Sequence, residues 1–213
     1  MILLLLGDSG FGRLQLRQIR LAMRRAEIAE QRILVAGERA ATLAGDPAAD
    51  GVTLVDEPAD RFLAAAVDDL PGDCRVIPPP IGRHIFARVL ADGCGGRLTA
   101  LASRFALPFA RGQDDVLYLS AAAWMCPVSC MAPQICPRIA FERTWHLPSL
   151  LRAWAREQGM GAIVFAPRGP ASGLESVSVL RLRGARRRVG KGGRFLVATS
   201  APCHAAVSVL QVG

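Results

Sequence analysis

The first half of the chain alternates between short apolar runs and stretches of helical periodicity. Residues 2–6 form a continuous apolar run that predicts a buried strand, and Gly7 closes it. Beyond this turn, apolar residues recur at spacings of three and four, at Leu16, Ile19 and Met23, which is the apolar stripe of a helix. The opening of the chain therefore predicts a strand, a glycine turn and a helix in that order.

The same alternation continues toward the middle of the chain. Further strands are expected over residues 32–36, 52–55 and 74–77, and helices over residues 58–67 and 81–90. Strands that alternate with helices favour a parallel sheet with right-handed crossovers. The predicted fold class is therefore α/β, with a Rossmann-like, doubly wound and mostly parallel sheet followed by a cysteine-bearing C-terminal half.

The C-terminal half is predicted to begin near Gly112. Its expected elements are a strand over 115–120, a cysteine-rich loop, a helix over 147–158, strands over 161–166, 177–183 and 194–199, and an apolar segment over 203–210. The predicted division is a nucleotide-binding type of half over residues 1–112 and a metal-binding half over residues 113–213. A single continuous domain built from both halves is the alternative, because 213 residues suit either arrangement.

The net charge of +8 is local rather than general. Seven cations and no acid lie between Arg181 and Arg194, so the rest of the chain is close to neutral. A solvated hairpin tip is the expected role of this cluster, and the scarcity of aromatic residues around it argues against nucleic-acid binding. No apolar run reaches the roughly 18 residues that a membrane span needs, and residues 1–6 lack the features of a signal peptide. We therefore expect a cytoplasmic protein without a membrane span.

The glycine turn is a candidate nucleotide site. Gly7, Gly10 and Gly12 lie between a predicted strand and a predicted helix, where a phosphate can rest on the helix N-terminus. Their spacing is GxxGxG rather than the dinucleotide fingerprint GxGxxG, and Glu38 is the acid available for ribose hydroxyls after the second strand. NAD or another nucleotide is one interpretation, and a turn retained only for its geometry is the other.

Three of the six cysteines lie within one short segment, as Cys126, Cys130 and Cys136 in the spacing CxxxCxxxxxC. Proline follows Cys126 and Cys136, which favours a stiff, extended loop. In a reducing cytosol, clustered cysteines are more often ligands or catalytic groups than disulfides. Structural zinc sites favour the tighter CxxC spacing, so an iron–sulfur cluster, with a four-iron, four-sulfur cluster favoured, is preferred over zinc. Redox-active or structural thiols without metal are the alternative.

A tetrahedral site or a cubane needs a fourth ligand. Cys203 and His204 are the best candidates, because they follow a predicted strand, where α/β sheets present functional groups. Cys74 and Cys94 are weaker candidates, since buried or incidental cysteine explains both.

The chain resembles a little-characterised group of small bacterial proteins labelled TrkA-N-like or potassium-transporter-like. The resemblance is carried by residues 7–12, by the Val-Ile-Pro-Pro-Pro segment before His84, by the CPxxCxxPxxCP loop, and by residues 198–204 ending in Cys203-His204. It implies that Cys126, Cys130, Cys136, Cys203 and His204 belong to one site. The transport label rests on the nucleotide-binding half alone.

Two functions follow as predictions. The first is a cytoplasmic Rossmann-like protein whose cysteine loop binds an iron–sulfur cluster or another thiophilic metal, with a role in redox chemistry, sensing or cofactor assembly. The second is a nucleotide-binding regulatory subunit of a cation transport system. A redox or transporter protein is the expected partner, and an exposed cluster loop could lie at a homo-oligomer interface. The sequence contains no pattern that assigns an enzymatic reaction or a substrate.

Overall fold

The computed structural model describes residues 1–7, 10–29, 32–79, 84–101, 105–124, 126, 130, 134–167, 169 and 174–213. These residues form five α-helices and three β-sheets, so the protein is a mixed α/β structure whose strands are partly parallel. The chain divides into two compact units: one contains residues 1–85 and 168–184, and the other contains residues 86–167 and 185–213. The predicted boundary near Gly112 lies inside the second unit.

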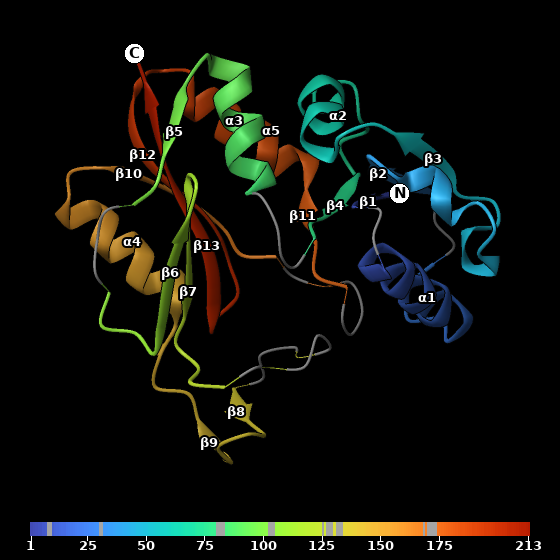
Figure 1. Cartoon of the computed structure of the whole chain (residues 1–213), viewed down its shortest axis with the longest axis horizontal. Helices are drawn as coiled ribbons and strands as arrows, with labels where there is room; N and C mark the ends of the chain where they lie inside the picture. The colour runs from blue at the N-terminus through green and yellow to red at the C-terminus, as the bar shows by residue number, and fades with distance from the viewer. Residues whose placement is uncertain are drawn as a thin grey trace. The chain divides into compact units, whose positions relative to one another are not determined.

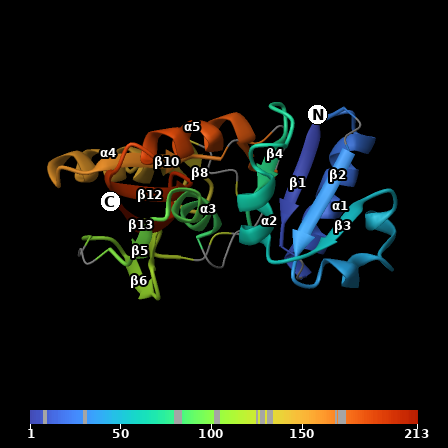
Figure 2. The ribbon, with the colours of Figure 1, turned by 90° about the horizontal axis from the view of Figure 1, so that it is seen from above.

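The first unit is built on a five-stranded sheet in the order β11-β4-β1-β2-β3. Strands β1 to β4 run parallel, and β11 pairs antiparallel with β4. Figure 2 shows β1 and β2 side by side. The elements are β1 (Ile2–Leu6), α1 (Gly10–Arg24), β2 (Arg32–Gly37), η1 (Ala40–Leu43), η2 (Pro47–Ala49), β3 (Thr53–Asp56), α2 (Ala59–Ala66), β4 (Arg75–Ile77) and β11 (Val177–Ser178). The strands and helices predicted for the N-terminal half are therefore confirmed up to β4.

The core of the first unit follows directly from the apolar run at the start of the chain. Leu3 and Leu5 of β1 are fully buried, and they pack in one cluster with Leu16 and Ile19 of α1. A strand buried on both faces needs a continuous apolar sequence, which is what residues 2–6 supply. This cluster fixes the strand end from which the glycine turn departs.

The second unit contains a six-stranded sheet in the order β10-β12-β13-β7-β6, with β5 also paired to β13. Its described elements are α3 (Ile85–Cys94), β5 (Arg97–Thr99), β6 (Phe109–Gln113), β7 (Val116–Ser120), β8 (Ile135–Cys136), β9 (Phe141–Glu142), α4 (Leu147–Glu157), β10 (Gly161–Phe165), β12 (Gly193–Ser200) and β13 (His204–Val212). Within the sheet, β7 lies between β13 and β6 (Figure 1). Helix α5 (Val179–Val189) is shared between the two units.

This second sheet is mostly antiparallel, so the mostly parallel character predicted for the sheet holds in the first unit and not in the second. Of the strand pairs described in this sheet, only β10-β12 is parallel. The pairs β12-β13, β13-β7, β13-β5 and β7-β6 are antiparallel. The physical reason is the length of the connections. Short turns join β6 to β7 and β12 to β13, and antiparallel strands are the arrangement that short turns allow.

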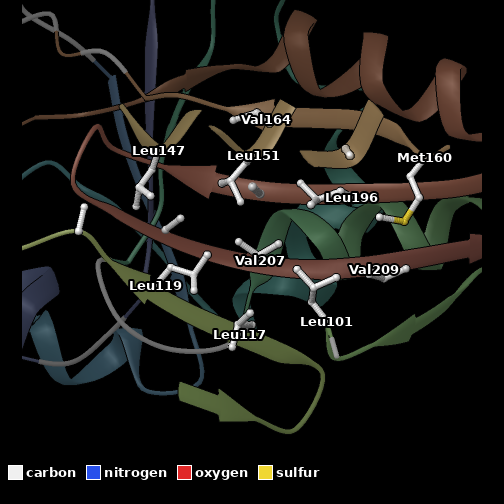
Figure 3. Packing of buried hydrophobic residues seen from close by; sticks show 14 residues of the cluster. Leu101, Leu117, Leu119, Leu147, Leu151, Met160, Val164, Leu196, Val207 and Val209 are labelled. Atoms are coloured by element: carbon white, nitrogen blue, oxygen red, sulfur yellow. The ribbon is translucent and has the colours of Figure 1, made fainter. Parts of the chain in front are cut away.

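Helix α4 covers one face of this sheet. Leu147, Leu151 and Ala155 recur every four residues along the helix, and all three are buried in one cluster with Leu196 of β12 and Val207 of β13. Figure 3 shows Leu147 and Leu151 of α4 in one cluster with Leu196 and Val207 of the strands. The cluster holds the start of α4 against the end of the sheet where β12 turns into β13.

One strand predicted for the C-terminal half is replaced by a helix over most of its length. Residues 177–183 were expected to form one strand, but β11 stops at Ser178 and helix α5 begins at Val179. The alternating sequence of residues 177–183 fits a strand, yet Val179, Leu182 and Val189 are all buried at spacings that a helix also satisfies. Arginine and leucine are good helix formers, which favours the helix.

Two smaller differences concern α3 and the segment after it. The helix continues to Cys94, through part of the turn expected at residues 92–96, and residues 81–83 of the predicted helix lie outside the described residues. Strands β5 and β6 had no expected counterpart in the sequence. Across the described part of the chain, none of the helices combines the length and apolar character needed to cross a membrane.

Candidate functional site

The candidate site lies at the turn between β12 and β13, which carries Cys203. The turn is tied to two other segments through its backbone. The N–H of Ala121, just after β7, donates to the carbonyl of Cys203 over 2.9 Å, and the N–H of Leu147, at the start of α4, donates to the carbonyl of Pro202 over 2.9 Å. Both ends of the segment that contains the cysteine loop are thereby fixed beside this turn.

The sulfur of Cys203 is buried and receives two hydrogen bonds. Its residue is 4% exposed. The indole N–H of Trp145 donates to the Sγ atom over 3.3 Å, and one guanidinium N–H of Arg143 donates to the same atom over 3.5 Å. Two N–H donors from the segment before α4 therefore converge on one buried sulfur atom.

The thiols of Cys126 and Cys130 lie in the same neighbourhood. Burial raises the pKa of Cys126, the charges of Cys130 and Cys203 raise it further, and a hydrogen bond with the Cys130 side chain acts in the same direction. Electrostatic coupling of this kind requires short separations, so the fold brings together sulfurs from two distant segments of the chain.

Two tryptophans accompany these sulfurs. The rings of Trp124 and Trp145 meet edge to face with centroids 6.4 Å apart. The buried indole N–H of Trp124 has no partner at full hydrogen-bond geometry among the described residues, but it faces Cys126 closely enough to lower the pKa of that thiol. The sulfur cluster, which we define as Cys126, Cys130 and Cys203, is therefore lined by N–H donors.

Cys136 and His204, the other two predicted ligands, have different surroundings. Cys136 is buried in the β8–β9 hairpin, where its carbonyl accepts the N–H groups of Ile139 and Ala140. His204 opens β13 in register with Ser120, and burial lowers the pKa of its imidazole.

The remaining cysteines have structural environments. Cys74 is fully buried in the first unit, and burial raises the pKa of its thiol to about 11. Cys94 lies at the end of α3 and donates to the carbonyls of Leu90 and Ala91.

The sulfur cluster is not a closed coordination sphere. Within the described ranges, no three His, Cys, Asp or Glu side chains are gathered tightly enough to hold a metal ion. The donor chemistry nevertheless fits a thiophilic ion, because Cys130 and Cys203 both influence the pKa of Cys126, and Trp145 and Arg143 donate to the sulfur of Cys203. Binding of an ion would have to draw the three sulfurs closer together.

The glycine turn in the first unit has the expected strand before it and the expected helix after it. Gly7 has φ of +117°, and its N–H donates to the carbonyl of Ala36 over 2.9 Å. A Cβ atom on Gly12 would lie 2.8 Å from the Gly7 carbonyl oxygen, so glycine lets α1 approach the strand end. Gly10 is the first residue of α1, and Glu38 is exposed in the turn after β2. Asp8 and Ser9 lie outside the described residues.

Two cations of α1, the helix that follows this turn, are paired with an acid. Arg13 and Arg17 of α1 form ion pairs with Asp46 at 3.0 and 3.3 Å. The backbone N–H of Ala48 and these guanidinium groups lower the pKa of the Asp46 carboxyl. A phosphate at the glycine turn would have to compete with Asp46 for Arg13.

Two arginines of the basic cluster, Arg183 and Arg188, bind backbone carbonyls. Arg183 donates to the carbonyls of Val67, Asp68 and Leu70, which follow the end of α2. Arg188 donates to the carbonyl of Ala162 over 2.9 Å. Cations bound to carbonyls at helix C-termini stabilise the helix dipole. The prediction of a solvated hairpin tip is wrong here, because these arginines lie on a helix and bind backbone carbonyls.

Sequence reasoning did not identify Trp124, Arg143 and Trp145 as parts of the site. The available signal was their position, since all three flank the cysteine-rich segment and two of the three tryptophans of the chain are among them. Their hydrogen-bonding role depends on the return of the chain to Cys203, which spacing along the sequence does not reveal.

The fold and the site together define a two-unit α/β protein whose second unit contains the sulfur cluster. Residues 97–213 match the family AF_1314_C, described as "Uncharacterized protein, C-terminal domain", and the chain belongs to this family. The matched residues include the whole sulfur cluster, together with Cys136 and His204, and exclude the glycine turn. No curated protein matches the chain, and no solved structure does.

Proposed function

We propose that this chain is a cytoplasmic protein that binds a thiophilic metal ion or an iron–sulfur cluster through Cys126, Cys130 and Cys203. The observation that supports the proposal is that Cys130 and Cys203 both act to raise the pKa of Cys126, although Cys203 comes from a distant segment of the same unit. Structural packing alone does not require thiols from separate segments to meet. A bound ion or cluster would supply redox or sensing chemistry, or would be transferred to another protein during cofactor assembly.

The surroundings of Cys203 also support this proposal. N–H groups that donate to a ligand sulfur stabilise its negative charge and tune the reduction potential of a bound cluster. Trp145 and Arg143 hold such positions around Cys203. Cys136 and His204 remain the predicted candidates for a fourth ligand. An iron–sulfur cluster with three protein ligands would leave one iron open to an external ligand.

Anaerobic purification followed by metal analysis and visible absorption tests the proposal. The natural protein should retain iron and sulfide, or another thiophilic metal, and should bind Cd²⁺ with the ultraviolet charge-transfer absorption of metal–thiolate bonds. Replacing Cys126, Cys130 or Cys203 with serine should abolish this absorption. Cys74→Ser and Cys94→Ser are matched controls that should retain it.

The opposite result is equally definite. Colourless, metal-free protein that does not bind Cd²⁺ and whose six cysteines all titrate as free thiols would exclude the metal site. If the protein does bind metal, comparison of Cys136→Ser with His204→Gln identifies the fourth ligand. Only replacement of that ligand should weaken metal binding.

One observation favours a second function, that of a nucleotide-binding regulatory subunit of a cation transport system. The order β3-β2-β1-β4 with parallel neighbours, and a glycine turn between β1 and α1, are features of a Rossmann-like, doubly wound sheet. Calorimetry with NAD, NADH, ATP and ADP tests this function. Heat of binding that disappears in Gly12→Val would support it, and no heat with any of the four nucleotides would exclude it.

A further inference from the structure

A row of exposed polar side chains crosses three neighbouring strands at one end of the second sheet. Arg194 of β12 and Arg97 of β5 are both in register with Gln211 of β13, which lies between them. Residues that lie opposite each other in antiparallel strands project from the same face of a sheet. All three are exposed, so the fold presents two guanidinium groups on one face. We call Arg97, Gln211 and Arg194 the arginine row.

The arginine row continues the sheet face that α4 covers. Two residues along the strands, Leu196, Val209 and Thr99 occupy the same register, and Leu196 and Val209 belong to the buried cluster beneath α4 (Figure 3). The helix ends at Glu157, and the face changes from buried apolar residues to exposed polar ones within two positions of each strand. The row is therefore a rigidly positioned part of the sheet rather than a group of loop residues.

The positive charge of the row is not neutralised on its own strands. The arginines that form ion pairs among the described residues are Arg13, Arg17, Arg25 and Arg88. Neither arginine of the row is therefore paired with a described acid. The chain has no Asp or Glu after Glu175, and the exposed Lys191 lies three residues before Arg194. Charge complementarity therefore selects an anionic partner for this face.

The surroundings of the row indicate which anion it suits. Small-molecule sites are concave and enclose most of the ligand, whereas this row lies exposed on a sheet face. Proteins that bind single-stranded nucleic acid use exposed aromatic rings for base stacking. The aromatic residue in these three strand segments is Phe195, and it is buried. An acidic polypeptide needs no such rings, because guanidinium groups pair directly with carboxylates.

We propose that the arginine row binds an acidic segment of a partner polypeptide. Neighbouring strands lie about 4.8 Å apart, so the backbones of Arg97 and Arg194 are separated by about 10 Å. Carboxylates on alternate residues of an extended segment are about 7 Å apart, within reach of both long arginine side chains. The amide of Gln211 lies between them and can donate to a carbonyl of the same segment.

The surface is separate from the sulfur cluster and does not depend on the proposed metal. Strand β12 carries Arg194 near its start and Ser200 at its end, next to the turn that holds Cys203. Six residues of strand correspond to about 20 Å. A partner on the arginine row therefore leaves the sulfur cluster uncovered.

Fluorescence anisotropy with the full chain tests this surface. The probes are a fluorescein-labelled oligoglutamate peptide, an oligoglutamine peptide of the same length, and single- and double-stranded RNA. We expect oligoglutamate to bind more tightly than the other probes and to dissociate as salt is added. Arg97→Ala and Arg194→Ala should each weaken its binding about two- to fivefold. Arg61→Ala is the matched control, because Arg61 is exposed on α2 in the first unit.

Substitution of Gln211 provides a test that loss of folding cannot imitate. Gln211→Lys should strengthen oligoglutamate binding, and Gln211→Glu should weaken it. The proposal is overturned if oligoglutamate does not bind, if RNA binds more tightly at the same salt concentration, or if Gln211→Lys brings no gain. An equal loss in Arg61→Ala also overturns it, since binding would then follow net charge alone. Cd²⁺ titration of the same samples reports on the proposed function separately.

Discussion

The indole N–H of Trp145 donates to the sulfur of Cys203 over 3.3 Å, although the two residues are 58 positions apart in the chain. This bond joins the segment before α4 to the β12–β13 turn. It places a neutral donor beside the guanidinium of Arg143, so two different groups stabilise one sulfur. The strength of this arrangement can be measured because each donor can be removed separately.

Replacing Trp145 with phenylalanine should weaken Cd²⁺ binding about tenfold, because groups that hydrogen-bond to metal ligands typically contribute this much to affinity. Titration of metal-free protein with Cd²⁺, followed by charge-transfer absorption, measures the change. Trp154→Phe is the matched control, since Trp154 packs against Phe105 with ring centroids 5.5 Å apart. An equal loss of affinity in both variants would show that only aromatic packing is involved.

Removing the neighbouring thiols should make Cys126 more reactive. The pKa of Cys126 is raised by burial and by the charges of Cys130 and Cys203. Cys203→Ser removes one of these charges, lowers the pKa and increases the thiolate fraction at pH 7.5, so alkylation by iodoacetamide should accelerate about two- to fivefold. Mass spectrometry of the Cys126 peptide gives the rate. An unchanged rate would mean that the two sulfurs do not interact.

Gly12→Ala should destabilise the protein by about 1–3 kcal/mol, because the added methyl group would lie 2.8 Å from the Gly7 carbonyl oxygen and the backbone must move. Gly184→Ala is the control within α5, where a Cβ atom meets no neighbour within 4 Å. Alanine is the better helix former, so this variant should gain up to about 1 kcal/mol. Urea unfolding measures the free energy of unfolding of both variants. A change of the same sign in the two variants would contradict the close approach of α1 to the strand end.

Acid should destabilise the protein partly through His84. Burial lowers the pKa of this imidazole to about 3, below the value of about 6.5 in an unfolded chain. Between these values the unfolded state binds a proton that the folded state does not, so stability should fall as the pH drops from about 6.5 toward 3. His84→Gln should flatten this dependence in urea unfolding measured from pH 7 to pH 4. An unchanged slope would show that His84 is not buried as a neutral group.

The elements that could be predicted are those whose own sequence determines their structure. Residues 2–6 are apolar throughout, so β1 is buried whatever surrounds it, and the leucines of α4 recur at helical spacing. By contrast, the apolar positions in residues 177–183 fit both the two-residue period of a strand and the 3.6-residue period of a helix. The helix is favoured by contacts such as that of Arg183 with the carbonyls after α2. Local pattern could not decide between the two structures.

The candidate site shows the same limit. The density of cysteines in residues 126–136 and the proposal of Cys203 as a distant partner both came from the sequence, and Cys203 is among the groups that raise the pKa of Cys126. The donors around Cys203 could not be predicted, because they depend on how the β12–β13 turn meets the segment before α4. Spacing along a chain does not describe contacts across a sheet.

The backbone bonds at the β12–β13 turn have a consequence for how the site tolerates chemical change. The carbonyls of Pro202 and Cys203 anchor Leu147 and Ala121, and neither bond uses a sulfur atom. The scaffold therefore holds its shape independently of what happens at the thiols. Binding of the proposed ion would therefore not require either of these backbone bonds to break.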